Sequence, residues 1–230
     1  MFGVSFSKLK VVGLPILVGM LSYQATAQTG AISSATAGSG RAAIEASESP
    51  RMNPGSLGFI RGYHFSSSYS SASSVDGWKG QEFSLGLVDH LPDTAIPSGL
   101  GYYQNRRSSD SIPDWTTKNL NISLGNFLFS SVSFGGSLLY REDLQDLERY
   151  AQINGDLGAL WAINRNVGLA LVVLSPFRSG VSFPERMRMK SQVGLGFNLN
   201  YQRFFRFKTD LTSGDNQNFQ KPIAAMGLES

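Results

Sequence analysis

The residue types that most often carry catalysis are scarce in this sequence, and none stands at a spacing that forms a known site. The two histidines, His64 and His90, are isolated, and there is no cysteine. A metal site needs several such ligands at short, defined spacings. There is no G-x-S-x-G turn or phosphate-binding loop, and Gly-x-Gly pairs such as Gly194-Leu195-Gly196 lie inside alternating segments. We therefore predict that the protein is not an enzyme and has no metal site and no cofactor.

Charged residues are the next candidates for chemistry, and they form two groups. The denser group runs from Arg141 to Arg149 and contains both signs of charge. It could be a partner surface or provide acidic ligands for calcium, but mixed signs are typical of a solvated loop, which we expect here. The pair Arg106-Arg107 could contact the phosphates of lipopolysaccharide. A plain polar loop is again the simpler interpretation.

Composition and the N-terminus indicate export. Only 16% of the residues are charged, against roughly 25% in soluble domains. Residues 1–27 have the three regions of a secretory signal peptide: two lysines, the apolar stretch Val11–Leu21, and the A-x-A site Ala25-Thr26-Ala27. The apolar stretch is shorter than the ~20 residues of a membrane-spanning helix. We predict cleavage before Gln28, with a retained N-terminal anchor as the alternative.

The net charge argues against a nucleic-acid partner. The full chain has 20 basic and 17 acidic residues. Removing Lys8 and Lys10 with the signal peptide leaves 18 basic against the same 17 acidic residues. So small an excess gives no basic surface for nucleic acid.

From residue 59 onward, hydrophobic and polar residues alternate with a period of two. The clearest segment is 192–202, in which every second residue from Val193 to Tyr201 is hydrophobic. Such alternation gives a β-strand one greasy and one polar face, whereas a helix would scatter the same residues around its surface. The other strongly alternating segments are 119–125, 131–141 and 205–211. Weaker alternation predicts strands at 59–71, 80–90, 98–105, 151–163, 167–175 and 221–229.

The ten predicted strands are long enough to cross a membrane when tilted, which takes ~9–11 residues. Connections after the even strands are short, at 91–97, 130, 164–166 and 203. Those after the odd strands are longer and polar, most clearly at 106–117, 143–150, 176–189 and 213–220. This alternation is expected of an up-and-down outer-membrane barrel with a periplasmic N-terminus. In the first strand, the serine-rich stretch 66–74 predicts loop-like mobility.

The segment from Gly40 to Ser71 resembles the start of FadL-like outer-membrane proteins, which include the PorV-like proteins of type IX secretion. Its counterparts of the family pattern are Gly40-Arg41-Ala42-Ala43, the acidic small-residue run 45–50, and Asn53-Pro54-Gly55-Ser56-Leu57. The resemblance implies that residues 28–58 fold inward as a hatch, positioned by Asn53, Pro54, Gly55 and Leu57. Asn-Pro is also a common turn dipeptide, and that interpretation stays open.

The resemblance implies an all-β fold: an antiparallel up-and-down transmembrane β-barrel formed by residues 59–230. Its location would be a Gram-negative type outer membrane, its partners outer-membrane lipid and a hydrophobic ligand, and its function passive transport or binding of hydrophobic small molecules. A non-transporting PorV-like scaffold or shuttle, with secretion-machinery proteins as partners, is the alternative; a secreted β-sandwich is a third. Family barrels have about fourteen strands, so we expect either a fragment lacking about four strands or a self-closed ten-stranded barrel.

Overall fold

The computed structural model describes residues 39–73, 79–109, 112–145, 148–177, 183–184, 187–201, 204–214 and 222–229. The predicted signal peptide, residues 1–27, and the first part of the predicted hatch, residues 28–38, lie outside this set. None of the helices within the set is long and apolar enough to span a membrane.

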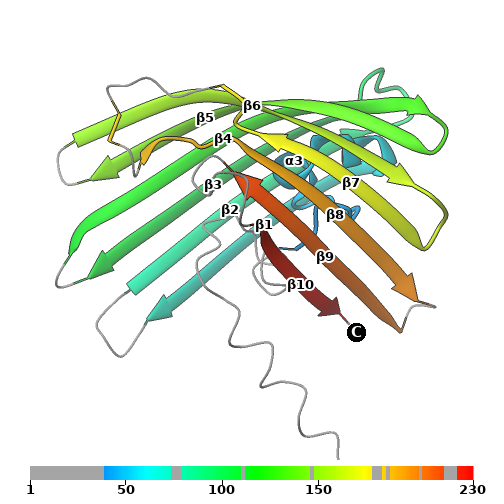
Figure 1. Ribbon diagram of the computed structural model, residues 1–230. Coiled ribbons are helices and arrows are strands. Elements are labelled where there is room, and N and C mark those ends of the chain that lie inside the picture. Colours follow the sequence, from blue (N-terminus) through cyan, green and yellow to red (C-terminus); the bar gives the residue numbers. More distant parts are fainter. Residues whose placement is uncertain are drawn as a thin grey trace, which may run out of the picture.

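Ten antiparallel strands form one sheet, in which each strand pairs with its neighbours in the sequence (Figure 1). The strands are β1 (Gly62–Ser73), β2 (Lys79–His90), β3 (Ser98–Ser109), β4 (Ile112–Phe129), β5 (Val132–Gln145), β6 (Glu148–Ala162), β7 (Val167–Leu174), β8 (Gln192–Tyr201), β9 (Phe205–Gly214) and β10 (Ile223–Glu229). This meander confirms the predicted all-β, up-and-down architecture. Within the described residues no ladder joins β1 to β10, so self-closure of ten strands is not observed.

The alternation that predicted the strands also sets their two faces. On β8, Leu195 is 54% exposed on the convex face, whereas Gly194, Gly196 and Asn198 are buried on the inner face. On β5, Leu139 interrupts the polar face in the sequence, and it lies buried on the inner side. The convex face is therefore apolar, and the inner face is built mainly of glycine and polar residues.

Two predicted loops are wrong. Strands β3 and β4 leave only residues 110–111 between them, and β5 and β6 leave only 146–147, so most of 106–117 and 143–150 continues the ladders. The charges that suggested solvated loops instead form cross-strand pairs, because strand residues that face each other can neutralise one another. Arg106 lies 3.1 Å from Asp114, and Lys118 lies 3.4 Å from Glu142.

The first strand also differs from its prediction. It begins at Gly62 and not at residue 59, because Pro54–Phe59 forms a 3-10 helix, η1. The described serines up to Ser73 are paired in register with β2, and the hydroxyl groups of Ser68 and Ser84 are 2.7 Å apart. Regular pairing replaces the loop that the serine-rich composition suggested.

Residues 39–60, which we call the inner segment, pack against the inner face of the sheet (Figure 1). They contain α3 (Ser49–Met52) and η1. Leu57 and Ile60 form one buried cluster with Val88 of β2, and Ala42 forms another with Leu160 and Ala170. The hydrophobic core thus lies between the inner segment and the wall of the sheet.

Glycines on the wall make room for the backbone of the inner segment. A β-carbon on Gly125 of β4 or on Gly135 of β5 would collide with the carbonyl oxygen of Pro54. A β-carbon on Gly99 of β3 would lie 2.6 Å from Cγ of Pro50. Beside these glycines, the side chains of Asn121 and Ser123 each donate a hydrogen bond of 2.5 Å to the carbonyl oxygen of Pro50.

Replacing Gly135 by alanine tests this close approach. The added methyl group would meet the Pro54 carbonyl, which is backbone and cannot rotate away. We expect Gly135→Ala to lower the free energy of unfolding by about 1–3 kcal/mol and to speed tryptic cleavage after Arg41 and Arg51. Denaturant unfolding of the protein in detergent measures the first effect, and mass spectrometry of the fragments measures the second.

Gly136→Ala is the matched control, because a β-carbon there lies 3.5 Å from Cδ2 of Leu157, an ordinary contact. We expect it to leave the cleavage rate unchanged. If both variants behaved like the unmodified protein, the inner segment would not press against the wall at Gly135.

Candidate functional site

The Asn53 side chain forms hydrogen bonds both within the inner segment and to the wall of the sheet. Its Oδ1 accepts the N–H of Gly55 at 3.0 Å, which caps η1. Its Nδ2 donates to the carbonyl oxygens of Arg41 at 2.9 Å and of Ala159 on β6 at 3.2 Å. The dipeptide Asn53-Pro54 therefore lies at a turn and contacts the wall in the same arrangement. Its role in positioning a hatch stays a prediction.

The other residues of the predicted hatch motif lie beside Asn53. Leu57 is fully buried in the cluster with Ile60 and Val88. Gly55 faces β6 so closely that a β-carbon would lie 2.7 Å from the carbonyl oxygen of Gly158. A side chain at position 55 would push the segment away from the wall, so glycine is required by space and not by backbone conformation.

A row of charged residues on β9, which we call the β9 charge row (Arg206, Lys208 and Asp210), holds the start of the inner segment. The Asp210 carboxylate accepts the backbone N–H groups of Gly40 at 2.8 Å and Arg41 at 3.2 Å, and Nη1 of Arg41 at 3.1 Å. Arg206 forms an ion pair with Glu45. Asp210 and Lys208 are both about 1% exposed, and charges buried to this degree need partners.

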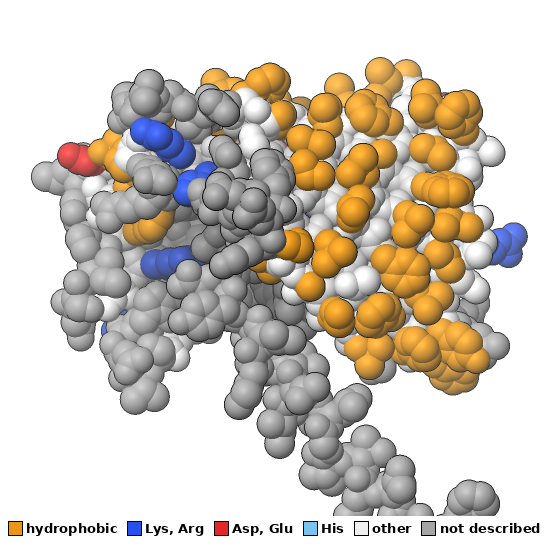
Figure 2. All heavy atoms as spheres, viewed as in Figure 1, with side chains coloured by type: hydrophobic (Ala, Val, Ile, Leu, Met, Phe, Trp, Pro, Cys, Tyr) orange, Lys and Arg blue, Asp and Glu red, His pale blue; other side chains and the backbone are white. Residues whose placement is uncertain are grey.

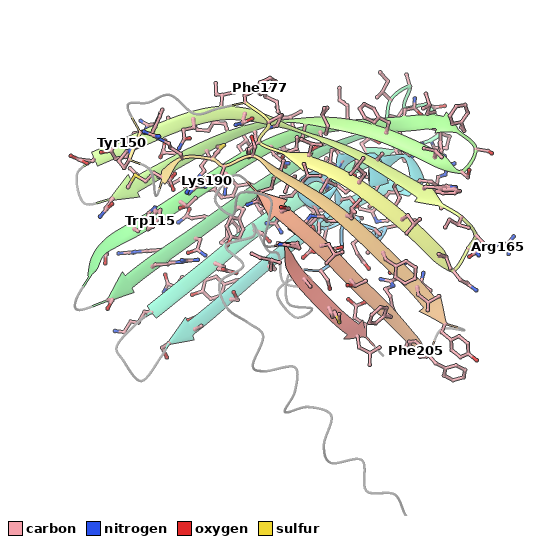
Figure 3. The ribbon with its side chains drawn as sticks, viewed as in Figure 1. Trp115, Tyr150, Arg165, Phe177, Lys190 and Phe205 are labelled. Atoms are coloured by element: carbon pink, nitrogen blue, oxygen red, sulfur yellow. The ribbon has the colours of Figure 1, made fainter. Side chains whose placement is uncertain are left out.

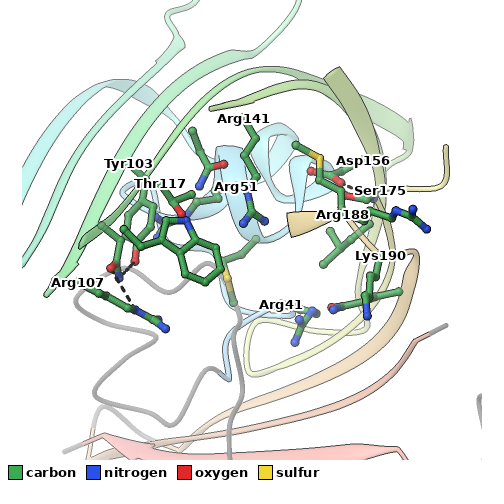
Figure 4. A pocket seen from close by; sticks show the side chains of 17 residues that line it. Arg41, Arg51, Tyr103, Arg107, Thr117, Arg141, Asp156, Ser175, Arg188 and Lys190 are labelled. Carbon is green, nitrogen blue, oxygen red and sulfur yellow. Dashed lines mark hydrogen bonds between the residues drawn. The ribbon is translucent and has the colours of Figure 1, made fainter. Parts of the chain in front are cut away.

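A cavity of about 410 Å³ lies next to α3, between the inner segment and the walls of β3 to β8 (Figure 4). Arg51 and Met52 of α3 form one side of it. The remaining described residues that line it are Arg41, Tyr103, Asn105, Arg107, Trp115, Thr117, Asn119, Arg141, Asp156, Leu174, Ser175, Arg188, Met189, Lys190 and Gln192. In Figure 4, Tyr103, Arg107 and Thr117 lie on one side, and Asp156, Ser175, Arg188 and Lys190 lie on the other.

Carboxylates behind the lining hold several of its side chains in place. Asp143 accepts hydrogen bonds from Nε1 of Trp115 at 3.2 Å and from the hydroxyl of Thr117 at 2.7 Å. Arg141 donates to both oxygens of Asp143, at 2.7 and 3.0 Å. Glu82 of β2 accepts a hydrogen bond of 3.0 Å from the hydroxyl of Tyr103 on β3. These bonds fix the rotamers of lining side chains, namely those of Tyr103, Trp115, Thr117 and Arg141.

Arg51 has a different environment from the other cations. Its guanidinium carbon lies 5.1 Å from the ring centroid of Tyr103, which is a cation–π contact. Burial lowers the pKa of the Arg51 guanidinium, and the nearby carboxylate of Glu48 opposes that shift. Its Nε is buried and has no hydrogen-bond partner among the residues that the structure describes.

The sequence did not predict this cavity, and three of its residues were misplaced. Arg107, Trp115 and Thr117 were expected in the predicted loop 106–117, but all three line the cavity from extended strands. The signal was present in the alternation: Tyr103, Asn105 and Arg107 share one face of a strand, as do Trp115, Thr117 and Asn119. Extending the period of two through the charged stretches would have found them.

The two histidines lie away from the cavity. Nδ1 of His90 is 2.5 Å from the carbonyl oxygen of Ile60, and Nε2 of His64 is 2.6 Å from that of Arg61. In the part of the chain that the structure describes, no group of three or more metal-ligand side chains occurs.

Comparison with solved structures supports the fold. No family model matches the chain, and no curated protein matches it. The crystal structure of the Ralstonia pickettii toluene transporter TbuX superposes with a TM-score of 0.61, over 87% of this chain and 78% of that one, at 11% sequence identity. The expected resemblance to FadL-like barrels is thus confirmed for the fold.

Replacing Asp210 tests its hold on the inner segment. Asp210→Ala leaves the Arg41 guanidinium and two N–H groups without their buried acceptor, so we expect it to cost about 3–5 kcal/mol of unfolding free energy. Asp210→Asn keeps an acceptor and should cost less. Denaturant unfolding and tryptic cleavage after Arg41 measure both variants.

Asp93→Ala, in the exposed turn between β2 and β3, is the control and should change stability by no more than about 0.5 kcal/mol. An Asp210→Ala protein as stable as this control would show that the β9 charge row does not hold the segment.

Proposed function

We propose that this chain is an outer-membrane β-barrel protein that passes or binds hydrophobic small molecules passively, with residues 28–58 acting as the hatch. We also propose that residues 1–27 are a cleaved signal peptide. The fold shared with a toluene transporter supports this proposal, and so do the outer face of the sheet, the position of the inner segment and the cavity.

The apolar outer face is the observation that carries the proposal. Figure 2 shows hydrophobic side chains spread across the convex face of the sheet. On the outward-facing positions of β5, β6 and β10, Leu138 is 58% exposed, Ile153 69% and Leu228 65%. Monomeric soluble proteins rarely expose apolar patches beyond a few hundred Å². Lipid tails would cover this face, and the polar groups of the inner face would remain in the lumen.

Different residue types border the apolar face at its two ends. At the end with the short turns, large aromatic side chains are exposed, and Arg165 lies beyond them (Figure 3). These aromatic residues are Phe129, Trp161, Tyr201, Phe204 and Phe205. At the opposite end, the ion pairs of Glu142 with Lys118 and Arg149 lie beyond Leu120 and Leu138. Aromatic and charged borders are typical of a membrane–water boundary.

The route through the molecule follows from the inner segment. The cavity is lined by residues toward the charged ends of β3 to β6, such as Arg107, Trp115 and Arg141. The inner segment packs nearer the short turns, where Phe59 contacts Phe127 and Gly58 faces Ser133. A ligand that reaches the cavity therefore meets the inner segment before it can pass, so the segment must shift to release it.

Cell fractionation and uptake test the location and the transport. We expect the protein in the outer-membrane fraction, and we expect cells that produce it to accumulate radiolabelled toluene or oleate faster than cells with the empty vector. Recovery of a freely water-soluble monomer would overturn the location. Correct localisation without any uptake would overturn transport, and cross-linking to large secretion proteins would then favour the scaffold alternative.

A reversible tether tests the hatch. An ideal β-carbon on Gly58 lies 3.0 Å from Cβ of Ser133 and closer still to its Oγ. The two backbones must therefore separate slightly to reach the ~3.5–4.5 Å between the β-carbons of a disulfide, and the chain has no cysteine of its own. We expect the double variant Gly58→Cys and Ser133→Cys to lose uptake when oxidised and to regain it with dithiothreitol. Each single variant is a control for the substitution alone. Equal uptake in both redox states would show that the segment need not move at this point.

A further inference from the structure

We infer that the cavity beside α3 is a binding site for a small aromatic carboxylate, an inference that rests on the proposed entry of small molecules into the lumen. It narrows the ligand from any hydrophobic molecule to one that carries a planar apolar ring and a single anionic group. Three observations carry it: the sign of the charges that face the cavity, the lack of a hydrogen-bond partner for the Arg51 side chain among the described residues, and the position of Trp115.

The side chains that face the cavity are cationic. Among the residues that the structure describes, five arginines and one lysine line it, against a single aspartate, Asp156. Asp210, Asp143 and Glu82 bind lining residues but are not themselves part of the lining. The cationic groups therefore border the cavity, and most of the carboxylates lie farther from it. Because the electrostatic interaction weakens with distance, an anion in the cavity is attracted by the nearer cations more strongly than it is repelled by these carboxylates.

Arg51 is the cation best placed to bind the anion. No hydrogen bond or ion pair joins the Arg51 side chain to another described residue, and its Nε is buried; the carboxylates of Glu48 and Glu82 act on it only as nearby charges. Buried charges are normally paired and hydrogen-bonded, because an unpaired one is costly. A planar guanidinium offers two parallel N–H groups to one carboxylate, which a neutral ligand cannot exploit. An uncharged hydrocarbon would leave this side chain desolvated and without an acceptor.

The apolar part of the lining suits a ring. The Trp115 indole is held at one wall by its hydrogen bond of 3.2 Å to Asp143. Met52, Met189 and Leu174 provide the rest of the apolar surface. Aromatic pairs gain stability from offset or edge-to-face packing, and flexible methionines adapt to an irregular ligand. The cavity volume of about 410 Å³ lies within the range of small-molecule sites.

Binding of benzoate and benzamide to the purified protein in detergent tests the inference. The two probes have nearly the same shape, but only benzoate is charged at neutral pH. Equilibrium dialysis with radiolabelled probes should show benzoate bound at least tenfold more tightly than benzamide. Arg51→Gln should remove most of that preference, a loss of roughly ten- to hundredfold in benzoate affinity. Arg51→Lys should retain part of it.

Arg165→Gln, in the exposed turn between β6 and β7, is the matched control and should bind both probes as the unmodified protein does. Arg107→Gln, at an exposed position of the lining, should weaken benzoate binding without unfolding the chain. Equal affinity of the unmodified protein for benzoate and benzamide would overturn the inference, whatever the variants do.

The uptake experiment separates this inference from the proposed function. Uptake of toluene combined with equal binding of benzoate and benzamide would leave transport standing and remove the anion site. Selective benzoate binding without uptake of any probe would leave the site standing and remove transport.

Discussion

The contact between the inner segment and a wall of glycines is the constraint on which the rest of the structure depends. Backbone approaches backbone near Pro54, Gly125 and Gly135 so closely that even a methyl group would not fit. Interiors are packed too densely to absorb such an addition without strain. Because the segment lies this deep, it packs on the inner face near the short turns and leaves the cavity on its other side.

Polar groups on both surfaces make that close contact stable. Backbone groups buried without partners would be costly, and the wall supplies them: Asn121 and Ser123 bind the carbonyl of Pro50, and Asp210 binds the N–H groups of Gly40 and Arg41. The inner face is therefore polar by necessity, whereas the outer face is free to be apolar. One sheet thus carries two chemistries, separated by the alternation of its side chains.

Local patterns in the sequence predicted the strands well and the site poorly, for one physical reason. Alternation is a property of neighbouring residues, so β5 and β8 could be located from their own sequences. The pairing of Lys118 with Glu142 joins positions far apart in the chain, so the charge of Glu142 was attributed to a solvated loop. The cavity combines inner-face residues from several strands with Arg51 of α3, and no single stretch reveals that combination. Asn53 was singled out because its family pattern is local, but its acceptor Ala159 on β6 was not.

The polarity of the wall has a consequence if the inner segment moves as proposed. The surface that it would uncover is mainly glycine, serine and asparagine, with the charges of β9 nearby, interrupted by the apolar residues Val88, Leu160 and Ala170. Its polar majority wets readily. The route would then be an aqueous channel and not an oily one, so opening would admit ions together with any organic solute. In a planar bilayer the event would register as a step in electrical current, and the arginines along the path would bias that current toward anions.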